Sequence, residues 1–186
     1  MRFPVQALCQ DQTILSGAQS GRRLFAALVG QAVEPRLPEV AFLDFAGIEV
    51  ATASCLRESV VAFRDHARTT LPNLYPVIAN PSPSVREELD FFLRQRKDVM
   101  WSCTLDAQGR AGTPELLGVL DEAHRAAFDL VQSLGIASAP DLAARSDAAV
   151  GPTAWNNRLS QLASRGLLIE RKAGKTKTFI PVLETN

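Results

Sequence analysis

Three apolar segments of strand length recur in the first 105 residues, and they limit the folds open to this chain. They occupy residues 40–45, 74–79 and 99–105. Continuous apolar runs of this length are typical of strands that are covered on both faces. The stretch after the first run has helical spacing, with Leu56, Val60 and Phe63 on one face. Strands separated by helices of this length pair in parallel through right-handed crossovers, so the sequence predicts an α/β fold.

The first 35 residues predict a hairpin followed by a helix. Residues 3–8 and 12–15 are short strand candidates, and residues 9–11 between them would form the turn. From residue 18 to residue 31 the apolar positions follow helical spacing, and Pro35 and Pro38 end that segment.

The passage FLDFAGIEVATASCLRESV joins the first apolar run to the start of the next helix. Its strand end, residues 43–47, and the helix start, residues 52–56, resemble the STAS domain of anti-sigma-factor antagonists. The passage is more similar still to a STAS-like family of uncharacterised bacterial proteins. The resemblance covers residues 3–106 and implies a STAS-like mixed sheet with helices that binds a partner protein or a second copy of itself.

The same resemblance bears on phosphorylation. STAS antagonists carry Asp-Ser-Ser-Gly at this helix start, and the first serine accepts phosphate. Aligned on Leu56, the four positions here are Thr52, Ala53, Ser54 and Cys55, so the acceptor is an alanine and the phosphorylation switch is not carried over. Thr52 and Ser54 remain candidate protein-interaction residues. Ser54 has two interpretations: a helix N-cap, which serine favours, or a docking and regulatory residue.

A domain boundary is predicted at residues 111–112, which divides the chain into domains of residues 1–112 and 113–186. Thr113 as N-cap and Pro114 at the first helical position predict a helix from there to Gly135. Its apolar positions recur at spacings of four and three: Leu116, Leu120, Ala123, Ala127, Leu130 and Leu134. This seam would pack against the rest of its own domain or pair with a second copy in a homodimer.

Residues 139–182 predict a helix, a turn, a second helix and a two-stranded hairpin with a basic tip. Trp155, Leu159 and Leu162 recur at i, i+4 and i+7 and form the inward face of the second helix. Its opposite face carries amides and hydroxyls and no carboxylate: Thr153, Asn157, Ser160, Gln161 and Ser164. Such groups both donate and accept hydrogen bonds, which suits base edges and phosphates.

The stretch RLSQLASRGLLIERKAGKTKTFIPV resembles a winged helix-turn-helix, in which a similar passage leads into a basic wing. The resemblance covers residues 122–182 and implies a small domain that binds duplex DNA. The candidate DNA-binding residues are Thr153, Asn156, Asn157, Arg158, Ser160, Gln161, Arg165, Arg171, Lys172, Lys175 and Lys177. Two alternatives stay open: a helical domain whose basic hairpin is a solvated face, and a winged helix that docks onto protein.

Charge is unevenly distributed although the net charge is zero. Residues 145–177 hold seven basic and two acidic side chains, a net +5, whereas residues 1–144 hold 13 basic and 17 acidic, a net −4. Positive charge gathered at one end of a neutral chain indicates a polyanion-binding end.

Other chemistry is not indicated by the sequence. Three widely spaced cysteines (Cys9, Cys55 and Cys103) suit reduced thiols in a cytoplasmic protein, and neither histidine has a second ligand at metal-binding spacing. No apolar run is long enough to span a membrane, and the N-terminus lacks the apolar core of a signal peptide. Residues 173–176 imitate the end of a phosphate-binding loop, but position 169 is Ile where that loop needs Gly. We therefore expect neither enzymatic activity nor a cofactor.

These observations together predict a bacterial, cytoplasmic, sequence-specific DNA-binding regulator or DNA-targeting adaptor, whose STAS-like domain mediates protein interaction. The alternative is a partner-switching scaffold in which the winged helix docks protein rather than DNA.

Overall fold

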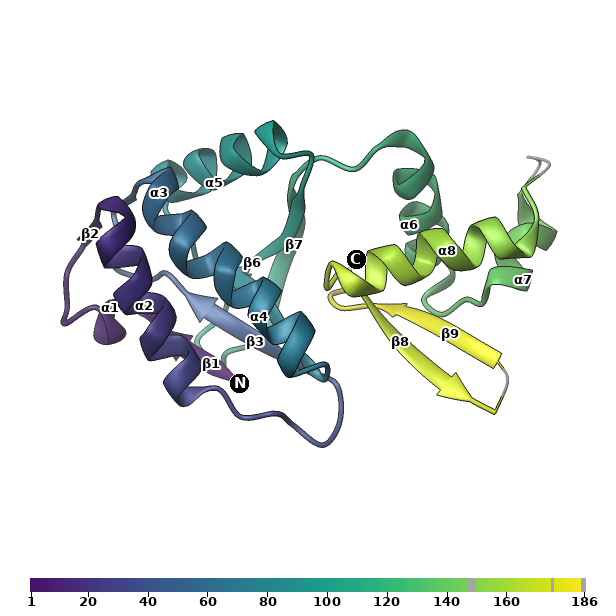
Figure 1. Cartoon of the computed structure of the whole chain (residues 1–186), viewed down its shortest axis with the longest axis horizontal. Helices are drawn as coiled ribbons and strands as arrows, with labels where there is room; N and C mark the ends of the chain where they lie inside the picture. The colour runs from purple at the N-terminus through teal and green to yellow at the C-terminus, as the bar shows by residue number, and fades with distance from the viewer. Residues whose placement is uncertain (147–149, 175, 185–186) are drawn as a thin grey trace. The chain divides into compact units, whose positions relative to one another are not determined.

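The computed structural model describes residues 1–146, 150–174 and 176–184, and the chain divides into two units. The first unit comprises Met1–Val119 and the second comprises Leu120–Asn186. Both are shown in Figure 1. The boundary expected at residues 111–112 is therefore wrong by seven residues, because those residues lie inside a strand of the first unit. In the part of the chain that the structure describes, no helix combines the length and apolarity needed to cross a bilayer.

A five-stranded mixed sheet forms the centre of the first unit, in the order β1-β3-β5-β6-β7. Its strands are β1 (Arg2–Pro4), β3 (Glu39–Asp44), β5 (Leu74–Ala79), β6 (Val99–Leu105) and β7 (Ala111–Gly118). The first four pair in parallel, and β7 pairs with β6 in antiparallel orientation. The predicted α/β class and the mixed sheet are thus confirmed.

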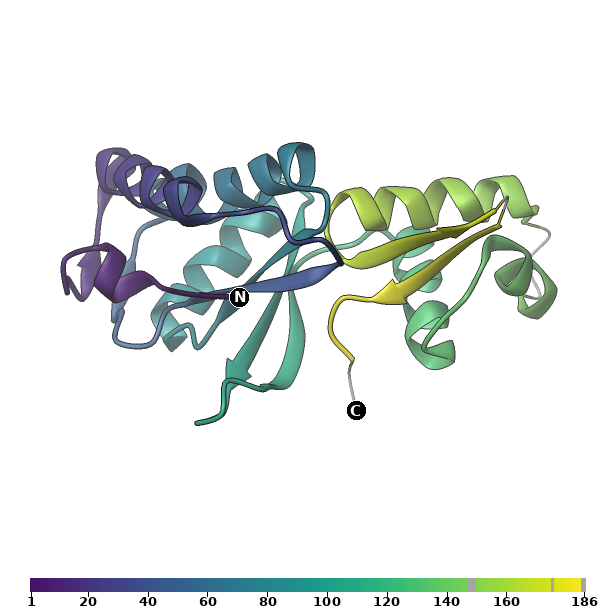
Figure 2. The same cartoon turned by 90° about the horizontal axis from the view of Figure 1, so that it is seen from below.

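The connecting helices of the first unit cover one face of this sheet, as Figures 1 and 2 show. They are α2 (Gly17–Gln31), α3 (Ala53–Leu56), a π-helical segment (Arg57–Val61), α4 (Ala62–Thr70) and α5 (Pro83–Gln95). Successive right-handed crossovers that step in one direction across a sheet place their helices on one face. The core lies between the two layers and includes Leu24, Leu43, Phe63, Ile78 and Leu89, all at most 1% exposed.

The expected N-terminal hairpin is wrong. Residues 5–8 form a short helix, α1 (Val5–Leu8), and β1 pairs with β3 instead of with the segment that follows it. That segment, β2 (Ile14–Leu15), pairs in parallel with β4 (Val50–Ala51) in a separate two-stranded sheet. Proximity in sequence favours pairing of these two short segments with each other, but each forms a parallel pair with a strand more than 30 residues away.

The helix expected from Thr113 is also wrong, because these residues belong to β7. Met100 pairs with Leu117 and Trp101 with Leu116, so this strand extends the sheet beyond β6. Pro114 is compatible with that position, since β7 is an edge strand and needs no amide donor on its free side. Of the predicted helical seam, Leu116 and Leu120 precede the helix that the structure contains, α6 (Glu122–Leu134).

The second unit combines three helices with a hairpin. α6 is followed by α7 (Ala139–Arg145), α8 (Pro152–Ser164), β8 (Leu168–Ala173) and β9 (Thr176–Pro181). α8 packs against α6, α7 and β8, and α6 packs against β9. Ala137, between α6 and α7, exchanges two backbone hydrogen bonds with Phe179 of β9, of 3.1 and 2.8 Å. The core of this unit is apolar and buried: Ala127, Phe128, Val131, Leu142, Trp155, Leu159, Leu162, Leu168 and Phe179.

Candidate nucleic-acid interface

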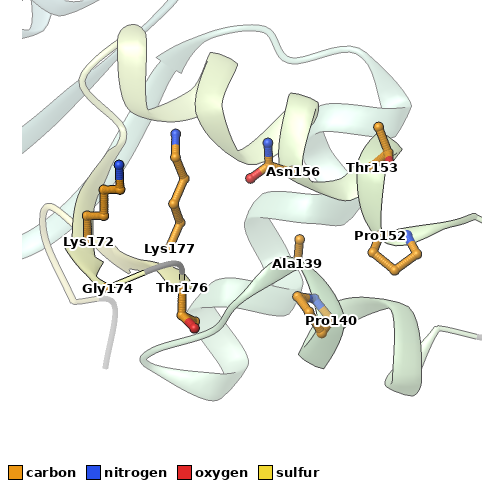
Figure 3. A pocket seen from close by; sticks show the side chains of 9 residues that line it. All are labelled: Ala139, Pro140, Pro152, Thr153, Asn156, Lys172, Gly174, Thr176 and Lys177. Carbon is orange, nitrogen blue, oxygen red and sulfur yellow. The ribbon is translucent and has the colours of Figure 1, made fainter.

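An open cleft of about 670 Å³ lies in the second unit, between the first turns of α7 and α8 on one side and the hairpin on the other. In Figure 3, Thr153 and Asn156 face it from α8, and Lys172 and Lys177 extend from the hairpin. Its lining is completed by Ala139, Pro140, Pro152, Gly174 and Thr176. None of the described residues that line the cleft carries a carboxylate, so the polar groups of this lining are cationic, amide and hydroxyl groups.

The first turn of α8 carries no capping side chain. Its N-cap is Gly151, which has no side-chain acceptor, and Pro152 occupies the first helical position. The first turn of α7 is capped in contrast: Ser138 Oγ accepts from the Asp141 amide and the Asp141 carboxylate accepts from the Ser138 amide. Because a helix N-terminus carries partial positive charge, the uncapped start of α8 favours an anion in the cleft.

The register of the hairpin decides which basic side chains reach the cleft. Lys172 and Lys177 are paired across the strands and therefore share a face, whereas Arg171 pairs with Thr178 on the opposite face. Lys177 forms an ion pair with Glu170 (2.7 Å). Lys172 is exposed, and its ammonium has no partner among the described residues. Lys175, the remaining candidate, lies outside the described residues.

The exposed residues of α8 agree in part with the outward face predicted from helical spacing. Thr153 and Asn157 are exposed and Ser160 is half-buried, and these three side chains fall within one narrow arc of the helix. Asn156 lies on the edge of that arc toward the hairpin and lines the cleft. Asn157 therefore presents an amide to solvent with no hydrogen-bond partner in the described part of the chain.

Gln161 lies on the other edge of the arc and is not free, contrary to expectation. Its Oε1 lies 2.8 Å from Nε2 of His124, on α6. The ring's Nδ1 lies 2.7 Å from the carboxylate of Asp121, the N-cap of α6. Sequence reasoning missed His124, because no local pattern links it to a residue 37 positions away.

By helical spacing, Arg158 and the C-cap Arg165 lie on one side of the outward face of α8, beyond Gln161. The guanidinium of Arg158 lies over the ring of the buried Trp155, 4.9 Å from its centroid. Arg165 is the C-cap of α8 and is half-buried. The structure thus brings Asn156, Lys172 and Lys177 together at the cleft. Thr153 both lines the cleft and belongs to the outward arc of α8. Arg158, Arg165 and Arg171 do not line the cleft.

At the helix start around Thr52 and Ser54 in the first unit, backbone amides are hydrogen-bonded to side chains of the protein itself. Thr52, not Ser54, is the N-cap: its Oγ1 accepts from the amides of Cys55 (3.4 Å) and Gly17 (3.1 Å). The Ala53 amide donates to the carboxylate of Glu88 on α5 (2.9 Å). Ser54 is half-buried, with its hydroxyl 3.2 Å from that of Thr52. The N-cap interpretation of Ser54 is therefore wrong.

The thiols of the first unit are poor nucleophiles. Burial raises the pKa of Cys9 to about 11, with a further contribution from Cys55, and raises the pKa of Cys103 to about 12, with a further contribution from Asp44. Burial also raises the pKa of Cys55. Thiols react as thiolates, so the raised pKa values disfavour nucleophilic reaction of these three groups near neutral pH. Among the described residues, no cluster of three or more His, Cys, Asp or Glu side chains is placed to hold a metal ion.

Comparison with known proteins adds nothing to this picture: no protein-family model, curated protein or solved structure matches the chain. What can be inferred about function rests on the residues of the two units.

Proposed function

We propose that the second unit is a winged helix-turn-helix module that binds duplex DNA, with α8 as the recognition helix and the β8–β9 hairpin as the wing. The observation that carries the proposal is the cleft between α8 and the hairpin, whose described lining contains Lys172, Lys177 and Asn156 and no carboxylate. DNA presents closely spaced phosphates, and a cationic cleft beside an amide-bearing helix face suits a phosphate backbone beside base edges.

The side chains divide into two roles under this proposal. Asn157 and Ser160 on the outward arc of α8 would contact base edges in the major groove, because an asparagine amide can bind adenine in bidentate fashion. Lys172 and Lys177 would contact phosphates, since ammonium groups carry little base information. The charge of Lys177 is partly neutralised by its ion pair with Glu170 within the hairpin. Lys172 is therefore expected to contribute more than Lys177 to DNA affinity.

The first unit would connect DNA binding to another macromolecule. Its mixed α/β sheet, and its resemblance to STAS-like proteins around residues 43–56, support a role in binding a protein partner or a second copy of the chain. The complete proposal is a sequence-specific bacterial regulator or DNA-targeting adaptor without enzymatic activity.

Titration of duplexes at several salt concentrations tests the proposal. Replacing Lys172 with Ala should weaken all duplexes about equally and reduce the slope of log affinity against log salt by about one, because one phosphate contact is lost. Asn157→Ala should weaken the preferred duplex more than random duplexes, by roughly 1–3 kcal/mol. The matched control is Arg36→Ala, which removes an exposed charge from the first unit and should leave both quantities unchanged.

The alternative function is the partner-switching scaffold whose second unit docks protein. It becomes the better account if no duplex binds near physiological salt, or if Lys172→Ala and Arg36→Ala have equal effects.

A further inference from the structure

A cavity of about 390 Å³ lies in the first unit, at the carboxyl ends of the parallel strands β5 and β6. Its walls come from β6, β7, the first turn of α5 and the two residues that follow β5. Open α/β sheets bind their ligands outside the carboxyl ends of their strands. The position and the size of this cavity are therefore those of a site for one small molecule.

Ser102 gives this cavity a buried hydroxyl group that has no protein partner. The residue is only 1% exposed, and its hydroxyl forms no hydrogen bond with any residue in the described part of the chain. Its strand is paired on both sides, with Ile78 of β5 and with Glu115 of β7, so its backbone lies in the sheet and its side chain faces the cavity. Because a buried hydroxyl is costly without a hydrogen bond, we expect a partner for it to enter the cavity.

β7 is irregular where it borders the cavity. The register between β6 and β7 shifts between Ser102 and Thr104, and two residues of β7, Thr113 and Pro114, lie opposite one residue of β6. Thr113 has a φ of 41°, which a β-branched residue rarely adopts. Its hydroxyl lies 2.7 Å from that of Thr104, and both residues line the cavity. Bulges and strained residues of this kind occur beside binding sites, where they redirect side chains.

Arg86 and Glu115 place an ion pair with unused bonding capacity in the lining of the cavity. Nε and Nη2 of Arg86 donate to the two carboxylate oxygens of Glu115, at 2.8 and 2.7 Å. A guanidinium and a carboxylate each have more hydrogen-bonding positions than this pairing uses. The Nη1 side of Arg86 has no partner among the described residues. A second carboxylate can therefore bind Arg86, and an ammonium group can bind Glu115, while the pair stays intact.

We propose that this cavity binds a small zwitterion of the α-amino acid class, with its carboxylate on Arg86, its ammonium group on Glu115 and a hydrogen bond to the Ser102 hydroxyl. Charge balance favours this class of ligand. Arg86 and Glu115 are the only charged side chains in the described lining, and their charges cancel. Burial raises the pKa of the Cys103 thiol, which also lines the cavity, to about 12, so this group stays neutral. A ligand with a net charge would leave that charge unbalanced, whereas a zwitterion matches both members of the pair.

NMR titration of the full chain with each of the common L-amino acids tests the proposal. At least one amino acid should shift the amide signals of Ser102, Thr113 and Glu115, with a Kd below about 1 mM. Two analogues of that amino acid, one without the ammonium group and one without the carboxylate, should each bind at least about tenfold more weakly, because each loses a charged hydrogen bond.

The proposal is overturned if no amino acid shifts these signals, since the cavity then holds only water. It is also overturned if either analogue binds as tightly as the amino acid, since the ligand is then recognised by one charge alone. The titration contains no DNA, so these outcomes leave the proposed function of the second unit standing.

Three variants test whether binding occurs in this cavity. Arg86→Gln should weaken the amino acid at least about tenfold through the lost charged hydrogen bond. Ser102→Ala should weaken it roughly 2- to 10-fold. The matched control is Arg94→Gln, which removes from the same helix an arginine that is paired with Asp90 (2.6 Å) and does not line the cavity. The control should leave the affinity unchanged, and equal losses for Arg86→Gln and Arg94→Gln contradict the proposal.

The stability of Ser102→Ala supplies a readout that is independent of any ligand. A hydroxyl without a partner contributes no hydrogen bond to the free protein, so its removal should leave the urea midpoint of the first unit unchanged or raise it. A lower midpoint would show that the hydroxyl is bonded within the protein, and the argument for a ligand at Ser102 would fail.

Discussion

The two units begin their central helices in opposite ways. In the first unit, Thr52 caps α3 and the carboxylate of Glu88 accepts from the amide of Ala53, so the positive end of the helix is already neutralised by the protein. In the second unit, α8 begins at Gly151 with no side-chain acceptor and opens into a cleft that contains two lysines. A helix N-terminus can thus either bond to groups of the protein itself, as in the first unit, or remain available to an anion, as in the second.

Net charge does not distinguish the two units, although local charge does. Residues 1–119 hold 12 basic and 13 acidic side chains, and residues 120–186 hold eight and seven. Within the second unit, residues 120–144 have a net charge of −3 and residues 145–186 a net charge of +4. The positive region is therefore α8 and the hairpin, and the acidic residues of α6 belong to the same unit. A domain average would have hidden this separation.

The largest expected effect comes from a substitution where α2 packs against the capped start of α3. It tests whether the stability of the first unit depends on this packing independently of the second unit. A Cβ added at Gly21 of α2 would lie 2.5 Å from the Cys55 carbonyl oxygen and 2.8 Å from Cβ of Glu58. Gly21→Ala should therefore lower the free energy of unfolding of this unit by roughly 1–3 kcal/mol, since the helices must move apart. Urea denaturation followed by Trp101 fluorescence in a Trp155→Phe background measures it.

The control for this variant is Gly30→Ala, on the same helix, where an added Cβ meets nothing within 4 Å. It should be neutral or stabilising by up to about 1 kcal/mol. The second unit, followed by Trp155 in a Trp101→Phe background, should be unaffected by Gly21→Ala. A loss of stability in both units would mean that they do not hold their helix starts independently.

The next effect separates Thr52 from Ser54. Thr52→Ala removes the acceptor of the Cys55 and Gly17 amides and should cost about 1–2 kcal/mol. Ser54→Ala removes only a contact between hydroxyls and should cost less than about 0.5 kcal/mol. Chemical denaturation of the two variants side by side decides between them. A larger loss for Ser54→Ala would restore serine as the structural residue at this start.

A smaller effect is expected from a substitution that caps the N-terminus of α8. Gly151 has a φ of −71°, and an added Cβ there meets no atom within 4 Å, so larger residues are sterically allowed. Gly151→Asp should stabilise the second unit by roughly 0.3–1 kcal/mol through the helix dipole. It should also weaken duplex binding several-fold, because its carboxylate repels phosphate.

Gly151→Asn is the matched control, since it supplies a similar cap without charge. It should stabilise the unit comparably and weaken DNA much less than Asp does. Fluorescence anisotropy with one labelled duplex compares them. Equal DNA affinities for the two variants would show that no phosphate approaches this helix start.

The last effect is absent at neutral pH and concerns the first unit alone, which holds all three cysteines. Burial raises the pKa of Cys9 to about 11 and that of Cys103 to about 12. Below the ordinary thiol value of about 9, both the folded and the unfolded chain bind the proton and stability is fully present. Above it the unfolded thiols ionise first, so stability falls as pH rises through the folded values.

Urea midpoints of the two units at about pH 8 and about pH 10 measure this difference. The midpoint of the first unit should fall further than that of the second. A Cys9→Ser/Cys103→Ala variant should lose most of the extra decrease. If its decrease equals that of the wild type, other groups control the alkaline behaviour.

Local sequence signals were sufficient for the strands that are continuous apolar runs. β5 and β6 have the predicted bounds, because apolar runs with helices between them leave few other arrangements. β7 could not be recognised, since Thr113 and Pro114 have the composition of a helix start and only pairing with β6 makes them a strand. The N-terminal segments failed for a different reason, because their strand partners are distant in sequence.

The candidate site divides in the same way. Helical spacing placed Asn157 and Ser160 on the outward face of α8, and a basic hairpin was predicted from composition. Which of its basic residues faces the cleft depends on register, which separates Lys172 from Arg171. The contact between Gln161 and His124 depends on how α6 crosses α8, and single-sequence patterns contain no information on that crossing.

The π-helical segment between α3 and α4 marks a position where the chain can tolerate a change of one residue in length. At residues 57–61 the helix widens by about one residue per turn, and Ser59 hydrogen-bonds to the Cys55 carbonyl (2.7 Å) inside it. An α-helix that gains one residue normally rotates everything beyond it by about 100° and exposes its core face. A wide turn of this kind can accommodate one additional residue, and in this chain Phe63 and Ala67 beyond it are buried. Homologues that are one residue shorter in this stretch should keep the same core with an ordinary α-helix, which makes this segment a place where the length of the chain can change without changing its fold.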